Sequence, residues 1–306
     1  NELFQLNDNK FQAVIFPDIG MNDQSIILAN IRIAPVQISL MGHSASTFGA
    51  KIDYYISGTE TEVIEDAEEN YSERLVLVPG IGVHPSLKNY SYIKKQKVEE
   101  PFIISCPWTI QKINYPHLIH LREILLRADK KILFRFFPSV MFEYYLNQIT
   151  SEIGSILGPE NIEIVPNLPS AKFEEYFQKG DLVIDSFHYG GYTTIIDALF
   201  LKKPMVVLEG NKLYNSFGNV FFRKLGLDEL IAKDSTEYIT KIVSLINDDS
   251  YYQKITDKIE NMENEVKKQI FDNGEPLYFK KAIDYLLENH QKLKSENSRK
   301  PIIIER

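Results

Sequence analysis

The order of apolar and polar runs along the chain predicts an α/β protein. From residue 101 on, short apolar runs typical of strands alternate with longer runs at helical spacing. The expected strands cover 102–106, 131–137, 162–167, 181–187 and 204–210, and the helical runs between them cover 116–128, 141–157, 171–180 and 195–203. This alternation predicts a Rossmann-like domain with five or six parallel strands.

The first third of the chain has a less regular pattern. Strand-like runs occupy 11–16, 36–41 and 52–57, and the acidic segment 58–75 reads as a surface helix and turn. Residues 89–100 are polar, charged and without periodicity, as in a linker. We therefore expect a first domain over 1–95, a second over 96–283, and a helical end with a tail over 284–306.

The composition suits a globular protein and excludes two classes of partner. Apolar residues make up 44% and charged residues 25% of the chain, and the net charge of −8 argues against binding a nucleic-acid backbone. No apolar run approaches the ~20 residues needed to span a membrane, and no signal peptide is recognisable. The single cysteine, Cys106, fits a reducing compartment such as the cytoplasm. Because the chain begins at Asn1, we expect a fragment or a processed product.

Four loops follow the predicted strands of the second domain. Ligands of doubly wound sheets bind beyond the carboxyl ends of the strands, which is where these loops lie. The loops are 107–116 with Thr109 and Lys112, 138–141, 166–171 with Asn167, Leu168 and Ser170, and 188–194 with two glycines and two threonines. The site is expected among them.

The last of these loops has the parts of a phosphate cradle. Gly190 and Gly191 permit a close backbone approach or a positive φ. Thr193 or Thr194 is placed to cap the next helix, whose N-terminus favours an anion. Asp197, one turn on, suits the two hydroxyls of a ribose. The simpler alternative is a tight turn whose Asp197 stabilises the helix dipole.

Other candidates also have two interpretations. Lys112 can reach a diphosphate as a point charge, although most lysines are solvated surface residues. Residues 166–169, "PNLP", can present backbone groups to a base edge or form a rigid turn. His43 is more simply a packed loop histidine than a catalytic one.

No metal or mononucleotide motif accompanies these residues. His117 and His120 are three apart on a predicted helix but lack a partner at metal-ligand spacing, so they are interpreted as non-ligands. Neither G-x-x-x-x-G-K-[ST] nor G-x-G-x-x-G is present, and there is no Asp-x-Asp pair. No cofactor and no metal are therefore expected.

Seven segments resemble, in order, glycosyltransferase family 41. They are "DIGM" (18–21), "RIAPVQISLMGHSAST" (32–47), "IDYYIS" (52–57), "SERLVLVP" (72–79), "QKINYP" (111–116), "GGYTTIIDALFLKKPMVVLEG" (190–210) and "LGLDELIA" (225–232). The family includes O-GlcNAc transferases and bacterial cytoplasmic N-glycosyltransferases that modify adhesins, and "DIGM" and "GHSAST" resemble the latter branch.

The resemblance implies a GT-B fold of two Rossmann-like lobes with a nucleotide-sugar between them. It further implies inverting, metal-independent transfer of a hexose or N-acetylhexosamine from UDP to a protein side chain. Carried over by motif, the UDP-binding residues are Thr109, Lys112, Asn167, Leu168, Gly191, Tyr192, Thr193, Thr194 and Asp197. Gly42 and His43 would face the donor or acceptor, and no general base is identified.

The chain departs from the family pattern in three places. Bacterial N-glycosyltransferases tend to have Asn at Thr193–Thr194, and O-GlcNAc transferases have His at Tyr192. Residues 1–95 resemble only the later part of the N-terminal lobe. Two alternatives therefore stay open: a non-catalytic subunit that binds a partner glycosyltransferase or an adhesin, and a GT-B UDP-sugar 2-epimerase.

Overall fold

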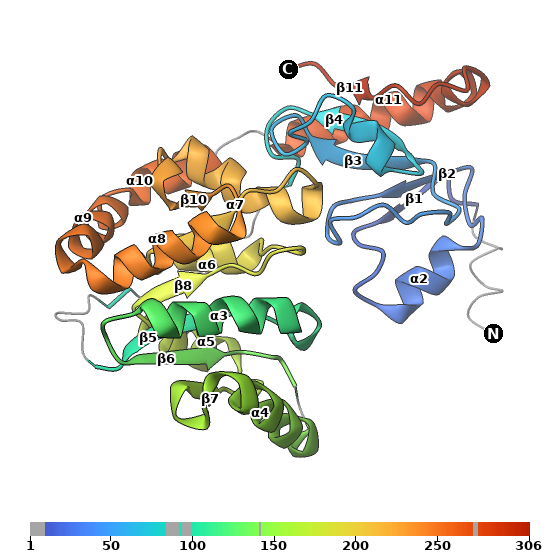
Figure 1. Cartoon of the computed structure of the whole chain (residues 1–306). Helices are drawn as coiled ribbons and strands as arrows, with labels where there is room; N and C mark the ends of the chain where they lie inside the picture. The colour runs from blue at the N-terminus through green and yellow to red at the C-terminus, as the bar shows by residue number, and fades with distance from the viewer. Residues whose placement is uncertain (1–9, 84–91, 94–99, 141, 272–274) are drawn as a thin grey trace. The chain divides into compact units, whose positions relative to one another are not determined.

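The chain forms two compact units, each built on one parallel sheet. The computed structural model describes residues 10–83, 92–93, 100–140, 142–271 and 275–306 (Figure 1). The first unit comprises Asn1–Ser86, Asn211–Ser216 and Ile270–Arg306, and the second comprises Leu87–Gly210 and Phe217–Gln269. Most of the expected linker 89–100 lies outside the described residues.

The sheet of the first unit has five parallel strands in the order β1-β2-β3-β4-β11. The strands are β1 (Ala13–Phe16), β2 (Val36–Ser39), β3 (Tyr54–Gly58), β4 (Arg74–Val78) and β11 (Ile302–Ile303). Helix α11 (Glu275–Ser295) packs on β2 and β4, and α2 (Asp23–Ala29) joins β1 to β2. The expected strands 11–16, 36–41 and 52–57 are confirmed with shorter bounds.

Alternating strand residues of this unit divide into two apolar clusters. The larger cluster joins one face of the sheet to α11 and contains Val36, Ile38, Tyr54, Ile56, Val76, Val78, Ala282, Leu286 and Leu293. The smaller cluster lies around α2 and contains Phe16, Ile19, Ala29 and Ile52. Both faces of the sheet are thus covered, as is usual for parallel sheets.

The acidic segment 58–75 is not a surface helix, and this expectation was wrong. Its only helical part is a 3₁₀ turn over Ala67–Asn70. Glu62 accepts a 2.6 Å hydrogen bond from the Tyr71 hydroxyl, and Glu73 is only 4% exposed. A run of acidic residues usually indicates a solvent-exposed face. Here hydrogen bonds from hydroxyl and backbone groups allow the carboxylates of Glu62 and Glu73 to be buried.

The C-terminal residues also differ from the expected separate end. The predicted boundary at 284 falls inside α11, and the predicted tail contributes β11 to the first sheet. Ile302 pairs with Val76, and Ile303 pairs with Leu77, in parallel register. A two-residue strand carries too little sequence pattern to be recognised without its partner.

The second unit contains a six-stranded parallel sheet in the order β10-β9-β8-β5-β6-β7. The strands are β5 (Phe102–Cys106), β6 (Ile132–Phe136), β7 (Ile162–Ile164), β8 (Leu182–Ile184), β9 (Met205–Leu208) and β10 (Ile231–Ala232). The helices are α3 (Tyr115–Arg127), α4 (Glu143–Leu157), α5 (Ser170–Gln178), α6 (Thr193–Phe200), α7 (Leu213–Lys224), α8 (Ser235–Asn247), α9 (Asp249–Glu260) and α10 (Glu263–Val266). The Rossmann-like domain is confirmed.

This strand order creates a switch point beside β5. The chain runs outward from β5 through β6 to β7, returns to β8 on the other side of β5, and continues to β9 and β10. Helix α3 packs between α4 and α8, and right-handed crossovers place α5 and α6 on the opposite face (Figure 1). The connections that follow β5 and β8 therefore run to opposite sides of the switch point, and ligands of doubly wound sheets bind at such points.

No helix among the described residues combines the length and apolar character that a membrane crossing requires.

Two helical glycines of the second unit should respond oppositely to alanine. A Cβ at Gly218 would lie 2.9 Å from the Cβ and Cγ1 of buried Val207, whereas one at Gly154 would meet its nearest atom at 3.5 Å. Gly218→Ala should therefore lower the free energy of unfolding by about 1–3 kcal/mol through overpacking. Gly154→Ala should raise it by up to about 1 kcal/mol, because alanine favours the helix.

Urea unfolding of both variants measures this contrast. Unchanged or increased stability in Gly218→Ala would show that α7 does not pack as closely on β9 as described. Reduced stability in Gly154→Ala would show that α4 has no room for a methyl group at that position.

Candidate functional site

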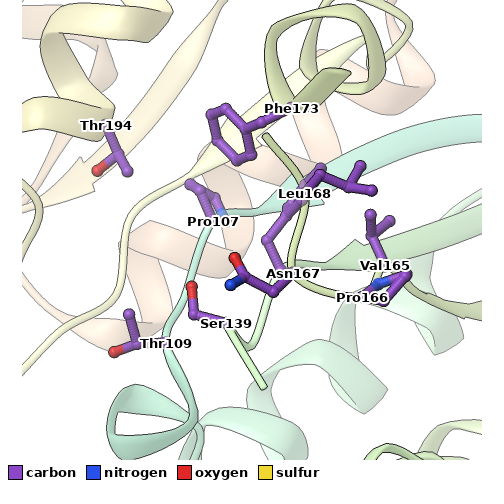
Figure 2. A pocket seen from close by; sticks show the side chains of 10 residues that line it. Pro107, Thr109, Ser139, Val165, Pro166, Asn167, Leu168, Phe173 and Thr194 are labelled. Atoms are coloured by element: carbon purple, nitrogen blue, oxygen red, sulfur yellow. The ribbon is translucent and has the colours of Figure 1, made fainter. Parts of the chain in front are cut away.

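A pocket of about 180 Å³ lies at the carboxyl ends of β5, β6 and β7 and at the start of α6. Its lining residues come from the loops after β5, β6 and β7 and from the first turns of α5 and α6. They are Pro107, Thr109, Phe137, Ser139, Val165, Pro166, Asn167, Leu168, Phe173 and Thr194. Figure 2 shows the Phe173 ring at one end of the pocket, with Leu168 and Thr194 to either side. Four predicted site residues, Thr109, Asn167, Leu168 and Thr194, are thus brought together.

The glycine loop after β8 requires glycine for close approach and not for a positive φ. A Cβ at Gly191 would lie 2.2 Å from the Thr194 Oγ1 and 3.1 Å from the Asp185 Oδ1. Neither Gly190 nor Gly191 has a positive φ, whereas His188 does, at 77°. The loop therefore folds tightly back over Asp185, with its one left-handed residue placed before the glycines.

The N-terminus of α6 lacks the predicted threonine cap. The N-cap residue is Tyr192, which makes no side-chain capping bond, and Thr193 and Thr194 are the first two helical residues. The Tyr192 ring packs 4.9 Å from the Phe217 ring. The first-turn N–H groups of a helix have no intrahelical acceptor. Without a side-chain cap, this helix end presents the donors and positive dipole end that an anion requires.

Lys112 reaches this loop from the next loop along the sheet edge. It ends a 3₁₀ turn over Ile110–Lys112, and its Nζ donates a 2.9 Å hydrogen bond to the Gly190 carbonyl oxygen. The same Nζ lies 5.2 Å from the centre of the Tyr189 ring. Lys112 is half-buried, so its interpretation as a solvated surface lysine is wrong.

A buried carboxylate lies beneath the glycine loop. Asp185 is 6% exposed, and its Oδ1 accepts hydrogen bonds from the N–H groups of Ser186 (2.9 Å) and Gly191 (2.8 Å). Burial raises the pKa of Asp185 to about 6, an effect that the nearby Lys112 charge and the two N–H donors reduce. Burial likewise lowers the pKa of Lys112, with Asp185 opposing the shift. Each charge is therefore poorly hydrated, and their mutual attraction compensates only in part.

Asp197 lies on α6 but outside its first turn. It is the fifth helical residue, counted from Thr193, and only 3% of it is exposed. The dipole interpretation requires a carboxylate in the first turn, where the effect is concentrated. Its position therefore does not support the alternative that Asp197 stabilises the helix dipole. The binding of ribose hydroxyls by Asp197 stays a prediction.

Sequence reasoning missed Phe173, which lines the pocket from α5. Its ring lies 5.0 Å from the Phe137 ring and 5.4 Å from the Phe177 ring, measured between centroids. Phe173 and Phe177 are four residues apart on α5, a spacing that is typical of a helix face packed on the core. The missing signal was the position of Phe173 in the first turn of a helix at the carboxyl edge of the sheet. An aromatic ring in such a pocket can stack on a nucleobase.

Gly42 and His43 lie in the first unit, in the loop after β2. A Cβ at Gly42 would lie 2.5 Å from the Pro17 carbonyl oxygen, and the His43 ring packs closely on Gly20. Burial lowers the pKa of His43, and the carboxylate of Asp18 opposes this shift. The predicted function of Gly42 and His43 remains a prediction.

Among the described residues, no three His, Cys, Asp or Glu side chains are grouped closely enough to hold a metal ion. His117 is 1% exposed and stacks on the Trp108 ring at 4.8 Å between centroids.

Comparisons with known proteins agree with this architecture. The family model described as "Glycosyl transferase family 41" matches residues 86–275. A UDP-glucose:protein N-beta-glucosyltransferase of Actinobacillus pleuropneumoniae serotype 5b is 29% identical over 240 residues, covering 76% of this chain. A probable UDP-N-acetylglucosamine–peptide N-acetylglucosaminyltransferase, SPINDLY of Solanum lycopersicum, is 23% identical over 226 residues, covering 71% of this chain.

A solved structure is similar to both units. An O-GlcNAc transferase mutant of Thermobaculum terrenum aligns with 94% of this chain at a TM-score of 0.77 and 18% identity, so it supports the fold alone. The chain spans 38% of the Actinobacillus protein, 24% of the Solanum protein and 55% of the Thermobaculum chain. Together with the two parallel sheets, this similarity establishes a GT-B type fold.

The raised pKa of Asp185 predicts a pH-dependent effect of Asp185→Asn on stability. Between about pH 4 and pH 6 the folded protein retains a proton on Asp185 that the unfolded chain releases, so the buried charge destabilises the fold increasingly as pH rises. Asparagine keeps the oxygen acceptor without the charge. The variant should therefore gain stability relative to wild type as pH rises, by on the order of 2–3 kcal/mol across the window.

Urea unfolding at about pH 4.5 and pH 7.5 measures this difference. Titration of His117 is common to both proteins and cancels in the comparison. A stability difference that does not change with pH would mean that the Asp185 carboxylate is not buried as a charge.

Proposed function

Because the chain belongs to glycosyl transferase family 41, we propose that its second unit binds a UDP-sugar and that the protein transfers the sugar to a protein side chain. The observation that carries the proposal is the meeting of three features at one sheet edge. These features are the pocket beyond β5–β7, the uncapped N-terminus of α6, and the Lys112 ammonium at the glycine loop. The named relatives are a protein glucosyltransferase and a peptide N-acetylglucosaminyltransferase, which supports a protein acceptor.

The pocket accounts for the nucleoside part of the donor. Phe173 is assigned to the face of the uracil, and the backbone groups of Asn167 and Leu168, which line the same pocket, are assigned to its polar edge. Thr194 belongs both to the pocket lining and to the first turn of α6. A nucleotide whose base fills the pocket therefore has its phosphates directed toward that helix end. Asp197, further along α6, is assigned to the ribose hydroxyls.

The N-terminus of α6 and the Lys112 ammonium are assigned to the departure of UDP as the leaving group. Direct displacement at the anomeric carbon breaks the bond to UDP, so negative charge develops on the β-phosphate. The N–H groups at the start of α6 and the Lys112 ammonium stabilise this charge electrostatically. Lys112 is partly dehydrated, which strengthens its attraction for an anion. These groups act without a metal ion, and we propose metal-independent transfer with inversion.

The acceptor half of the reaction is assigned to the first unit. Gly42 and His43 lie beyond the carboxyl end of β2 in the first sheet, the edge at which GT-B lobes present their ligands. An adhesin-like protein is the proposed acceptor, in a reducing compartment such as the cytoplasm. The donor sugar is a hexose or an N-acetylhexosamine.

Two alternatives differ in what they bind. A non-catalytic subunit would bind a partner enzyme or an adhesin but not UDP. A UDP-sugar 2-epimerase would consume UDP-N-acetylhexosamine without any protein acceptor. Both are disfavoured by the protein-modifying activities named for the relatives.

Lys112→Ala tests the diphosphate assignment. Isothermal titration with UDP and with uridine, in EDTA throughout, compares ligands that differ only in the diphosphate. The variant should bind UDP about 10–150-fold more weakly, because a charge-assisted bond contributes roughly 1.5–3 kcal/mol. Uridine affinity should stay within roughly twofold, because Lys112 is assigned only to the phosphates.

Lys179→Ala serves as the control, since Lys179 is exposed and paired with Glu175. Equal losses for UDP and uridine would place Lys112 away from the diphosphate. A wild-type titration with Mg²⁺ in place of EDTA separates the two remaining outcomes. No UDP binding in either condition would favour the subunit alternative, and binding with Mg²⁺ that EDTA abolishes would contradict metal independence.

Asp197→Asn tests the ribose assignment. The variant should fold normally and bind UDP and uridine more weakly, because a neutral amide replaces a carboxylate acceptor for two hydroxyls. A 2′,3′-dideoxyuridine diphosphate lacks those hydroxyls, so its affinity should change little. If the dideoxy compound loses as much affinity as UDP, Asp197 acts on the helix or the pocket and not on the ribose.

A further inference from the structure

His117 joins the backbones of the two loops that form the diphosphate side of the site. Its Nε2 accepts a 3.1 Å hydrogen bond from the Phe187 N–H, in the loop after β8. Its Nδ1 lies 3.2 Å from the Lys112 carbonyl oxygen, in the loop after β5. Phe187 and Lys112 are 75 positions apart in the sequence, by subtraction of their numbers. One imidazole therefore connects the segment that carries the lysine to the segment that carries the glycines.

The partners of the ring determine its tautomer. A backbone N–H can only donate, so Nε2 is the unprotonated nitrogen and Nδ1 carries the hydrogen given to the Lys112 carbonyl. Burial lowers the pKa of His117 to about 4, which keeps the ring neutral at neutral pH. Asn114 caps α3 by accepting from the His117 N–H at 3.1 Å, and this fixes the start of the helix from which the ring projects.

Aromatic neighbours fix the plane of the ring. Trp108 stacks on one face at 4.8 Å, and the Phe187 ring meets the imidazole edge-on at 3.9 Å between centroids. The Trp108 indole N–H in turn donates to the Ile184 carbonyl oxygen at 3.0 Å, which ties this stack to the end of β8. The imidazole consequently has little freedom to rotate away from either loop.

We propose that His117 is a positioning residue of the donor site: it holds the Lys112 turn and the 185–191 loop in register, so that the lysine ammonium and the α6 N-terminus meet the same phosphate. The inference rests on the proposed function and names a residue that touches neither the base nor the phosphates. It acts through Lys112, whose own backbone carbonyl it binds, and through the loop that leads into α6.

His120 provides a matched comparison on the same helix. It lies three residues further along α3, and its ring also packs on Phe187, at 5.3 Å between centroids. Its buried Nδ1 has no hydrogen-bond partner among the described residues. His120 thus packs on the same aromatic ring as His117, but its Nδ1 makes no hydrogen bond to either loop. Comparing variants of the two histidines therefore distinguishes an effect of aromatic packing from an effect of the hydrogen bonds that join the loops.

The experiment measures UDP and uridine affinity, in EDTA, for wild type, His117→Phe, His117→Gln and His120→Phe. Phenylalanine keeps the stack but leaves the Phe187 N–H without its acceptor. His117→Phe should therefore lose about tenfold or more in UDP affinity while uridine affinity stays within roughly twofold. Glutamine can place a carbonyl oxygen near the Nε2 position, so His117→Gln should recover most of the loss. His120→Phe should bind both ligands like wild type.

Three outcomes would overturn the inference. UDP affinity unchanged in His117→Phe would show that the bridge does not position the phosphate groups. Equal losses for UDP and uridine, or equal losses in His117→Phe and His120→Phe, would show that the ring only packs the core. If wild type binds UDP while any of these occurs, the proposed function stands and only the role of His117 fails. Wild type that does not bind UDP would overturn both.

A second comparison decides the matter if His117→Phe does not fold. Asparagine can donate from the Nδ1 position to the Lys112 carbonyl but is one bond too short to reach the Phe187 N–H. The Lys112 carbonyl oxygen also accepts a 3.2 Å hydrogen bond from the Asn114 side-chain amide, so losing the Nδ1 donor should cost less than losing the Nε2 acceptor. Bridging therefore predicts tighter UDP binding by His117→Gln than by His117→Asn, at equal uridine affinity. Equal UDP affinity in these two polar variants would contradict the bridge.

Discussion

The proposed donor site depends on a cation that the fold keeps partly out of water. The Lys112 ammonium is held by the Gly190 carbonyl oxygen, over an Asp185 carboxylate that is itself buried. Burial shifts the pKa of each group toward its neutral form, so neither charge is fully compensated by the other. An arriving diphosphate offers the lysine a stronger partner than a neutral carbonyl. In the proposed reaction, the energy of that exchange would contribute to binding UDP and to stabilising it as the leaving group.

The rest of the second unit holds this arrangement in place. The strand order makes the loops after β5 and β8 neighbours, and the close approach at Gly191 lets the second loop fold over Asp185. Helix α6 then begins without a side-chain cap, which in most helices would leave its first N–H groups to water. In this chain the uncapped end lies beside a pocket lined by Phe173 and Asn167. A nucleotide can place its base in this pocket and its phosphates at the N-terminus of α6 at the same time.

Sequence alone predicted the positions of the loops better than the contacts within them. The alternation of apolar runs was sufficient to place Thr109, Asn167, Leu168 and Thr194 at one edge, because parallel strands end on the same side. It was not sufficient to show that Tyr192 precedes the first turn of α6, since a threonine fits the N-cap and the N1 position alike. Local propensity does not distinguish neighbouring positions at a helix end.

Other features required long-range contacts that no pattern expresses. The acidic run 58–75 reads as a surface segment, yet Glu73 accepts a hydrogen bond from Ser46, which lies well before the run. Glu62 accepts hydrogen bonds from Ser57 and Tyr71, which the fold brings to it from either side. Strand β11 exists only because β4 offers an edge to Ile302. His117 has no metal-ligand spacing, and its role emerges only when the loops of Lys112 and Phe187 are placed side by side.

A crystal structure of the protein with UDP bound tests the central claim most directly. The account predicts phosphate oxygens within about 3 Å of the first-turn N–H groups of α6 and of the Lys112 Nζ, with that Nζ displaced from the Gly190 carbonyl oxygen. The uracil should lie on the Phe173 ring. UDP bound with its diphosphate away from α6, and with Lys112 still bonded to Gly190, would contradict the account.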